Sequence, residues 1–160
     1  SLINKYPNLI ITRTFSKAFG LASLRIGYTI SSEANISEMM KVRGPYDISM
    51  PAVVAAKAAL QDVKSMEEYV DEVMNNAKPM VEKFFKENNI EFHPSRANFI
   101  LFKPNSKLIA AKLKDSGFLT RPREGINIEG TVRVTIGTVE QMKKFINQFK
   151  NVKKIRIFGP

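Results

Sequence analysis

Two short apolar segments near the start of the chain predict strands of a buried sheet. Leu9-Ile10-Ile11 is a continuous apolar run, and a second strand is expected over residues 24–30. Continuous runs of this length are typical of strands that are covered on both faces. An isolated pair of strands is marginally stable, and no later segment supplies several more strands of this kind. We therefore expect a larger sheet that this chain contains incompletely.

The rest of the chain predicts helices packed on a smaller sheet. Helices are expected over residues 31–42 (with a serine N-cap), 52–60, 64–87, 106–115 and 140–149, and strands over residues 90–93, 98–103, 118–121 and 131–136. Pro79 should kink or divide the longest helix, because proline removes a backbone donor. Residues 44–51 predict a linker or crossover. The predicted fold class is α/β followed by α+β, with a largely antiparallel second sheet.

Composition narrows the class of protein. Of the 160 residues 44% are hydrophobic and 25% are charged, which is ordinary for a globular domain. No apolar run approaches the roughly 20 residues of a membrane-spanning helix, residues 1–16 lack a secretory signal pattern, and cysteine is absent. No spacing of residues typical of a metal site occurs. These features favour a cytoplasmic protein.

The net charge of +10 permits several partners. A strongly basic chain can bind nucleic acid, an acidic membrane surface or phosphorylated small molecules. The lysines, however, stand in mixed-sign runs such as residues 78–86, which solvated helix faces explain. We therefore expect neither a nucleic acid nor a membrane as a partner.

Lys17 stands where the first strand ends, the part of an α/β sheet at which ligands bind. A lysine held there should be partly desolvated, which favours the neutral amine that forms a Schiff base with an aldehyde. Thr14 and Ser16 offer hydroxyl groups on one side of the strand, and Arg25 can bind a phosphate through two parallel hydrogen bonds. The residues alone also fit a second interpretation, in which Lys17 and Arg25 are surface charges.

Residues 16–28, with the sequence Ser-Lys-Ala-Phe-Gly-Leu-Ala-Ser-Leu-Arg-Ile-Gly-Tyr, resemble the lysine signature of fold-type I aminotransferases. These enzymes use pyridoxal 5′-phosphate (PLP), and this form of the signature is typical of the histidinol-phosphate aminotransferase branch. Ser23 stands where that branch usually has glycine. The resemblance implies that Lys17 forms the Schiff base with PLP and later acts as general base. It also implies that Thr14, Ser16 and Arg25 bind the cofactor phosphate.

The same resemblance implies a division of the chain. Residues 1–45 would be the C-terminal end of the large PLP-binding α/β domain, with two buried strands and a helix. Residues 46–160 would be the small C-terminal α+β domain, and Tyr46 would belong structurally to the crossover between the two. Family members are generally homodimers that act on small amino-acid and 2-oxo-acid substrates, so we expect a homodimer.

A second informative strand is expected over residues 131–136. Alternation places Val132 and Val134 on one face and Arg133 on the other. Such an arginine can grip a carboxylate, although a solvent-facing arginine fits the pattern equally well. Residues 132–138 resemble the family motif Leu-Arg-x-x-x-Gly-Thr, with Val132 in place of leucine. The resemblance implies that Arg133 binds the α-carboxylate of the substrate.

Three further residues are candidates for substrate binding. In the family an arginine at the position of Arg121 contacts the substrate phosphate or the distal carboxylate of glutamate. Arg123 competes for this role, and the proline that follows Arg121 favours Arg121. Asn98 matches the family's asparagine before the first strand of the small domain, with a substrate-side role or a role in a turn. His93, the only histidine, is interpreted as a strand residue without a catalytic role.

The predicted function is PLP-dependent transamination between an amino acid or an amino-phosphate similar to histidinol phosphate and a 2-oxo acid such as 2-oxoglutarate. The reaction needs a carboxylate that keeps the pyridine nitrogen protonated. In the family this group precedes the lysine, whereas residues 1–16 contain no aspartate or glutamate, so we expect the chain alone to be inactive. Two alternatives are a threonine-phosphate decarboxylase of the same branch and a non-catalytic basic binding domain.

Overall fold

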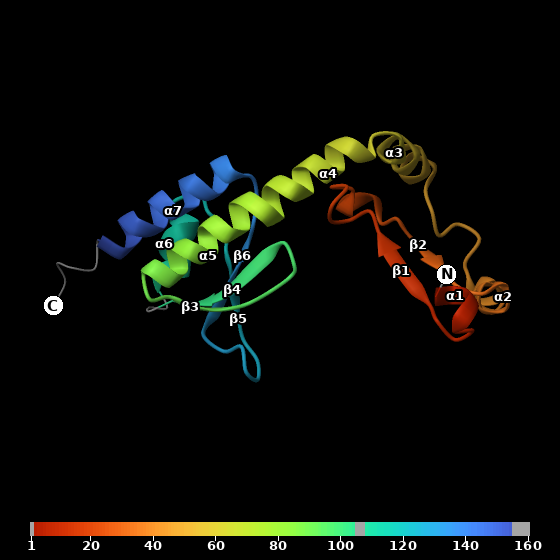
Figure 1. The fold of residues 1–160 in the computed structure, drawn as a ribbon, viewed down its shortest axis with the longest axis horizontal. Helices are drawn as coiled ribbons and strands as arrows, with labels where there is room; N and C mark the ends of the chain where they lie inside the picture. The colour runs from red at the N-terminus through yellow and green to blue at the C-terminus, as the bar shows by residue number, and fades with distance from the viewer. Residues whose placement is uncertain (1, 105–107, 155–160) are drawn as a thin grey trace. The chain divides into compact units, whose positions relative to one another are not determined.

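The computed structural model describes residues 2–104 and 108–154 (Figure 1). The chain divides into two compact units, Ser1–Glu67 and Glu68–Pro160, called unit 1 and unit 2 below. The helices are α1 (Leu2–Lys5), η1 (Ala22–Leu24), α2 (Glu33–Val42), α3 (Met50–Gln61), α4 (Val63–Asp71), η2 (Glu72–Ala77), α5 (Lys78–Glu87), α6 (Leu108–Asp115) and α7 (Val139–Lys154). The strands are β1 (Ile11–Thr14), β2 (Gly27–Ile30), β3 (Glu91–His93), β4 (Phe99–Lys103), β5 (Arg121–Arg123) and β6 (Thr131–Thr135). The predicted boundary between a large domain (residues 1–45) and a small domain (residues 46–160) refers to the complete protein, and it stays a prediction.

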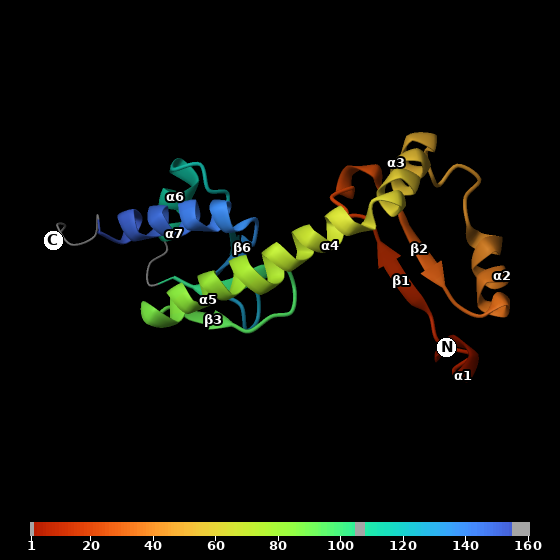
Figure 2. The same ribbon diagram turned by 45° about the horizontal axis from the view of Figure 1, so that its top comes forward.

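Unit 1 contains an antiparallel pair of strands, β1 and β2 (Figure 2). The pairing runs from Ile11 opposite Ile30 to Thr14 opposite Gly27. Strands were expected at residues 9–11 and 24–30, whereas β1 begins at Ile11 and β2 covers residues 27–30. Within this unit every residue of β2 is exposed and only Ile11 of β1 is half-buried, and their burial was expected in a larger sheet that the chain contains incompletely. Among the described residues of unit 1, no third strand pairs with β1 or β2, so each of them has one free edge.

Helix α2 confirms the predicted serine N-cap. The hydroxyl oxygen of Ser32 accepts a hydrogen bond from the backbone N–H of Asn35 at 3.4 Å, which satisfies one of the free donors of the first turn. The side-chain amide of Asn35 then donates to the carbonyl oxygen of Pro7 at 2.8 Å, and the Ser31 hydroxyl donates to that of Leu9 at 2.7 Å. These bonds fix the start of α2 to the segment that leads into β1.

Unit 2 is an antiparallel four-stranded sheet with the order β3-β4-β6-β5 and helices α5, α6 and α7 (Figure 1). This confirms the α+β fold and the antiparallel sheet. Strand β5, however, covers residues 121–123 and not the predicted 118–121. Pro122 lies within it, opposite Val132. A proline cannot donate to the ladder, yet it is tolerated here because β5 is an edge strand with a neighbour on one side only.

The core of unit 2 lies between one face of the sheet and the helices. Phe85 of α5 is fully buried, and its ring centroid lies 4.9 Å from that of Phe102 in β4. In β6 the predicted alternation is confirmed, because Val132 and Val134 are buried in this core while Arg133 is half-buried on the opposite face. One face of the sheet is thus covered by helices, and the other carries Arg133.

The long helix predicted over residues 64–87 is interrupted just before Pro79 by a π-helical segment, in line with the expected division. It is formed by α4, by the π-helical segment η2 and by α5, with Pro79 in the first turn of α5. A proline ring clashes with the carbonyl group one turn earlier in a regular helix. The wider turns of η2, which end at Ala77, stand where this clash would occur. Among residues 2–104 and 108–154, no helix is both long and apolar enough to cross a membrane.

The start of α7 explains the glycine and threonine at positions 137 and 138. The backbone N–H of Thr138 donates to Oε1 of Gln141 at 3.0 Å, and the N–H of Gln141 donates to Oγ1 of Thr138 at 3.3 Å. This reciprocal pair is a capping box. A methyl group on Gly137 would lie 2.0 Å from Oε1 of Gln141, so only glycine leaves room for the cap.

Gly137→Ala is therefore expected to displace the Gln141 side chain and to lower the free energy of unfolding by about 1 kcal/mol, the usual loss for a helix cap. Thermal unfolding of the purified protein measures this loss. Gln141→Ala removes the same bonds, so the double variant should be no less stable than the worse single variant. Losses that add up fully would show that the glycine acts in another way.

Candidate active site

The candidate lysine lies in a tight loop that joins β1 to β2 in unit 1. Phe15 anchors this loop, because its side chain is only 4% exposed and packs against two other rings. The centroid of its ring lies 5.0 Å from that of Phe19 and 5.8 Å from that of Tyr28. Backbone pairing continues past the strands, since the N–H of Phe15 donates to the carbonyl oxygen of Ile26 at 3.3 Å. This bond draws together the two chain segments that carry Ser16 and Arg25.

The hydroxyl of Thr14 has a defined role in this loop. Its oxygen accepts a hydrogen bond from the backbone N–H of Ser16 at 3.0 Å. A hydroxyl that accepts through its oxygen keeps its own hydrogen for donation, and Thr14 is exposed. The bond therefore holds Thr14 next to Ser16 and leaves a donor that can face an anion.

Arg25 adopts the left-handed backbone conformation, with φ at 52°, directly after the short helix η1. This conformation is uncommon for residues other than glycine, and such residues cluster at ligand-binding sites. One nitrogen of its guanidinium, Nη1, donates to the carbonyl oxygen of Ala22 at 2.8 Å, which fixes the side chain across η1. The other N–H groups of the guanidinium remain for a phosphate.

Lys17 is exposed in unit 1, so the partial desolvation that we expected from its place at the strand end is not provided by this unit. The residues around it, from Thr14 to Gly20, form a surface turn in which the N–H of Gly20 donates to the carbonyl oxygen of Lys17 at 3.0 Å. A turn on two uncovered strands cannot exclude water from a side chain. Any desolvation of Lys17 must come from outside unit 1.

Gly27 explains a further position of the lysine signature. It pairs with Thr14 across β1 and β2, and a methyl group on it would lie 2.6 Å from the carbonyl oxygen of Arg13. The obstacle is backbone, which cannot turn aside as the end of a side chain can. Glycine at this position therefore allows β2 to approach the strand end that carries Thr14.

Unit 2 carries the second group of candidates on the sheet face opposite the helices. Arg121 of β5 lies directly opposite Arg133 of β6. Opposed residues of antiparallel strands point to the same face, with Cα atoms roughly 4.5–5.5 Å apart. The guanidinium carbon of Arg133 lies 5.3 Å from the ring centroid of Phe99, an attractive cation–π contact. Two like charges placed opposite each other repel, and an anion between them would offset this cost.

Among the described residues, no carboxylate forms an ion pair with Arg121 or Arg133. Arg123 lies on the same face as Arg121 but opposite Thr131, two pairs further along the strands. The register therefore brings Arg121, and not Arg123, across from Arg133.

Asn98 directly precedes β4, the second strand of unit 2. Its side chain is exposed, and its carbonyl oxygen accepts a hydrogen bond from the N–H of Ile136 at 2.9 Å. This bond fixes Asn98 to the end of β6, the strand that carries Arg133. His93 is an exposed residue of β3 opposite Leu101, as expected of a strand histidine.

Lys78 was not recognised in the sequence as a site-related residue. Its side chain is 4% exposed and lies beneath the loop that leads to Asn98. A signal existed, because Lys78 stands three residues before Val81 and seven before Phe85, on the apolar side of the predicted helix. A lysine on an apolar stripe is out of pattern, since lysine is almost never fully buried without partners.

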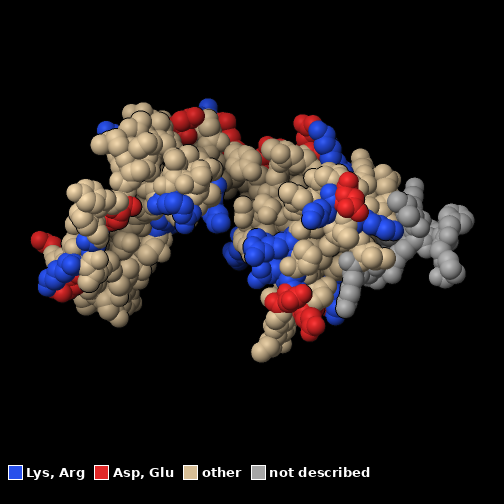
Figure 3. All heavy atoms as spheres, turned by 180° about the vertical axis from the view of Figure 1, so that it is seen from behind, with Lys and Arg blue, Asp and Glu red and all other residues tan. Residues whose placement is uncertain are grey.

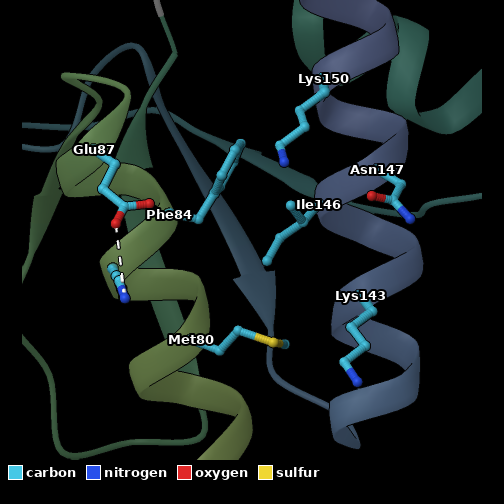
Figure 4. Close-up of a pocket in the computed structure, with 8 residues that line it drawn as sticks. Met80, Phe84, Glu87, Lys143, Ile146, Asn147 and Lys150 are labelled. Atoms are coloured by element: carbon cyan, nitrogen blue, oxygen red, sulfur yellow. Dashed lines mark ion pairs between the residues drawn. The ribbon is translucent and has the colours of Figure 1, made fainter.

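On the face drawn in Figure 3, Lys and Arg side chains form several separate groups, and Asp and Glu lie next to some of them. Between α5 and α7 there is a groove of about 410 Å³ with Met80, Phe84 and Ile146 facing into it and Lys143 and Lys150 at its edge (Figure 4). It belongs to the helical layer and not to the sheet face of Arg133.

Within residues 2–104 and 108–154, no cluster of three acidic or histidine side chains suits a metal ion.

The predicted linker over residues 44–51 is bridged by an ion pair. Arg43 donates to both carboxylate oxygens of Asp47, from Nη2 at 2.9 Å and also from Nε. The hydrogen bond from Arg43 lowers the pKa of Asp47, and the same bond raises the pKa of Arg43. Tyr46 between them is 94% exposed. Both ends of the pair are solvated, so it holds the turn with a small contribution to stability.

Comparison with known proteins decides the family. Residues 1–149 match the family described as aminotransferase class I and II. The chain belongs to this family. Over 158 residues it is 37% identical to the histidinol-phosphate aminotransferase of Lysinibacillus sphaericus, covering 96% of this chain and 42% of that relative. The chain thus spans less than half of the relative's length.

Solved structures agree with this membership. The histidinol-phosphate aminotransferase of Sinorhizobium meliloti, solved in complex with PLP, is 28% identical, with a TM-score of 0.79 over 93% of this chain and 42% of that one. The L-threonine-O-3-phosphate decarboxylase of Porphyromonas gingivalis has the same TM-score at 23% identity, over 95% of this chain and 49% of that one, and this likeness shows the fold alone. The fold is that of the fold-type I aminotransferases, as expected from the lysine signature.

The class I and II aminotransferases use PLP, and the donor groups of unit 1 fit this cofactor. Lys17 has a primary amine that would bond to the aldehyde. The Thr14 hydroxyl and the remaining N–H groups of Arg25 would be donors for the phosphate dianion. These groups stand on one loop whose backbone is fixed by Phe15 and Gly27, as a rigid phosphate site requires.

Proposed function

We propose that the complete protein containing this chain is a PLP-dependent aminotransferase. It transfers an amino group between an amino acid or an amino-phosphate similar to histidinol phosphate and a 2-oxo acid such as 2-oxoglutarate. The main support is the register of unit 2, in which Arg121 lies opposite Arg133 on one sheet face without a described carboxylate partner. Two opposed arginines suit anionic substrates: glutamate and 2-oxoglutarate each carry two carboxylates, and histidinol phosphate carries a phosphate.

In this proposal the residues of unit 1 hold the cofactor. Thr14, Ser16 and Arg25 bind its phosphate, and Lys17 bonds to its aldehyde carbon. PLP supplies an electron sink that makes the hydrogen on the substrate α-carbon acidic. The amine of Lys17 would act as general base and take this proton from the α-carbon. It would give a proton back later in the same half-reaction.

The residues of unit 2 orient the substrate. The Arg133 guanidinium donates two parallel hydrogen bonds to the α-carboxylate of an amino-acid or 2-oxo-acid substrate, and its cation–π contact with Phe99 limits its freedom before binding. Arg121 binds the phosphate or the distal carboxylate, and Asn98 donates from its side-chain amide. Because histidinol phosphate carries a phosphate where glutamate and 2-oxoglutarate carry a distal carboxylate, Arg121 is the residue that must bind both kinds of anion.

The proposed protein is a cytoplasmic homodimer with small-molecule substrates. The chain covers 42% of the length of its relative from Lysinibacillus sphaericus, and its residues 1–16 hold no carboxylate for the pyridine nitrogen. By itself it should therefore not catalyse transamination. A domain boundary near residue 45 and the site residues given above are parts of the same proposal.

Half-reactions of the complete protein test the function. The PLP form is mixed with histidinol phosphate or glutamate and no acceptor, and the loss of the absorbance of the aldehyde cofactor is followed. We expect conversion with both donors, and recovery of the absorbance when 2-oxoglutarate is added. Release of carbon dioxide from threonine phosphate in place of amino transfer would identify a decarboxylase. A salt-sensitive DNA gel shift with no reaction would support the basic binding domain.

A further inference from the structure

Lys78 is a buried cation in unit 2 that none of the proposed catalytic steps uses. It is the first residue of α5, and its side chain is 4% exposed. Its ammonium group donates to the carbonyl oxygen of Ala97 at 2.9 Å and to that of Ser95. Among the described carboxylates, none forms an ion pair with it. A buried charge held by carbonyl dipoles alone costs free energy, so its retention calls for a reason.

The bonds of Lys78 fix the peptide group on one side of Asn98. No cis peptide bond occurs in the described chain, and in a trans peptide the C=O and N–H groups point in opposite directions. With the Ala97 carbonyl directed at Lys78, the N–H of Asn98 must point away from it. On the other side, the carbonyl oxygen of Asn98 accepts from the N–H of Ile136 at 2.9 Å. Both peptide groups that flank Asn98 are therefore held.

The same loop leads directly to Phe99, the residue that contacts Arg133, the arginine proposed to bind the carboxylate. Phe99 follows Asn98 directly, pairs with Thr135 of β6, and supplies the ring over which Arg133 lies at 5.3 Å. A shift of the loop at Ala97 would be passed on to Asn98 and to Phe99. The contacts thus run from Lys78 through the loop to two of the residues proposed to bind substrate.

We propose that Lys78 is a positioning residue for substrate binding, which acts through the carbonyl groups of Ser95 and Ala97 on Asn98 and on the Arg133–Phe99 pair. The expected effect on KM rests on the proposed function. The expected effect on the position of the loop rests on the contacts within unit 2 alone. Lysine suits this task because its ammonium group has several donors and can reach two carbonyl groups at once. An apolar residue would fill the space without orienting the loop.

The test compares Lys78→Met with two other variants of the complete protein. Lys78→Arg keeps the charge and the donors, and Lys83→Met removes an exposed lysine from the same helix as a matched control. We expect Lys78→Met to lower kcat/KM for both amino-acid and 2-oxo-acid substrates by roughly 10- to 100-fold, mainly through KM, since small misplacements of binding groups have effects of this size. Lys78→Arg should restore most of this loss, and the affinity for PLP should not change.

Hydrogen–deuterium exchange gives a readout that does not depend on activity. In Lys78→Met the amide of Ile136, which is bonded to Asn98, should exchange faster, whereas Lys83→Met should leave it unchanged. If the wild-type protein shows no transamination, the proposed function fails while this measurement still tests the positioning of the loop. Unchanged exchange, or a lower melting temperature with an unchanged KM, would overturn the inference. If Lys78→Met does not fold, Lys78→Gln takes its place in both measurements with the same expected and contrary results, since an amide is polar but has fewer donors than an ammonium group.

Discussion

Replacing Lys17 by alanine is expected to abolish the covalent attachment of PLP and to lower the rate of transamination by roughly three to four orders of magnitude, a loss of the size expected when a general base is removed. Both the attachment of PLP and the proton transfer are lost, because the same amine bonds to the cofactor and moves the proton at the α-carbon. Lys17→Arg should be equally inactive, since a guanidinium stays protonated and is a poor nucleophile. The phosphate donors Thr14 and Arg25 remain, so PLP should still bind non-covalently.

Borohydride reduction of the complete protein with PLP, followed by mass mapping, measures the attachment directly. The wild-type protein should carry the label on Lys17, and Lys17→Ala should carry none. Lys57→Ala removes an exposed lysine from α3 of the same unit and should leave both label and rate unchanged. A label on a different lysine, or a wild-type rate in Lys17→Ala, would end the assignment.

Replacing Arg133 by glutamine is expected to lower kcat/KM by about 30- to 5,000-fold, which corresponds to the roughly 2–5 kcal/mol lost when one partner of a hydrogen-bonded charge pair is removed. Amino-acid and 2-oxo-acid substrates should be affected alike, because both carry the α-carboxylate. Arg133→Lys should fall between wild type and glutamine, since lysine keeps the charge without the two parallel bonds. Affinity for PLP should be unchanged.

Steady-state kinetics with both substrates measure this effect, and Lys143→Gln on the exposed surface of α7 is the control. The neighbouring arginines give a sharper comparison. Arg121→Gln should weaken substrates with a second anion and spare those with an apolar side chain, whereas Arg123→Gln should have a small effect. A kcat/KM for Arg133→Gln within about threefold of wild type would mean that Arg133 is a surface charge, since surface ion pairs contribute little.

Much of the local structure could be predicted because its causes lie within a few residues. The serine cap of α2 and the alternation in β6 are such cases, and both agree with the structure. The lysine signature is also local, and it led to the family before any contact was known. The capping box at Thr138 and Gln141 was missed, although threonine followed three residues later by glutamine is its sequence signature.

Other features depend on what lies beside a segment. The burial expected for the first two strands requires neighbouring strands and helices, and within unit 1 the residues of β1 and β2 are almost all exposed. Pro122 was expected to follow a strand, but it lies inside β5, where an edge position makes its missing N–H harmless. At Pro79 the expected division takes the form of a π-helical segment before the proline, which removes the clash with the preceding turn.

The sequence by itself determined the family, the candidate lysine with its hydroxyl groups and arginines, and the order of most helices and strands. Only the tertiary structure decided that Arg121 lies opposite Arg133, that Gly27 must admit the backbone of Arg13, and that Lys78 is buried beneath the loop of Asn98. The reason is the range of the interactions. Capping and periodicity act between residues close in the chain, whereas strand register and burial depend on segments that meet only after folding.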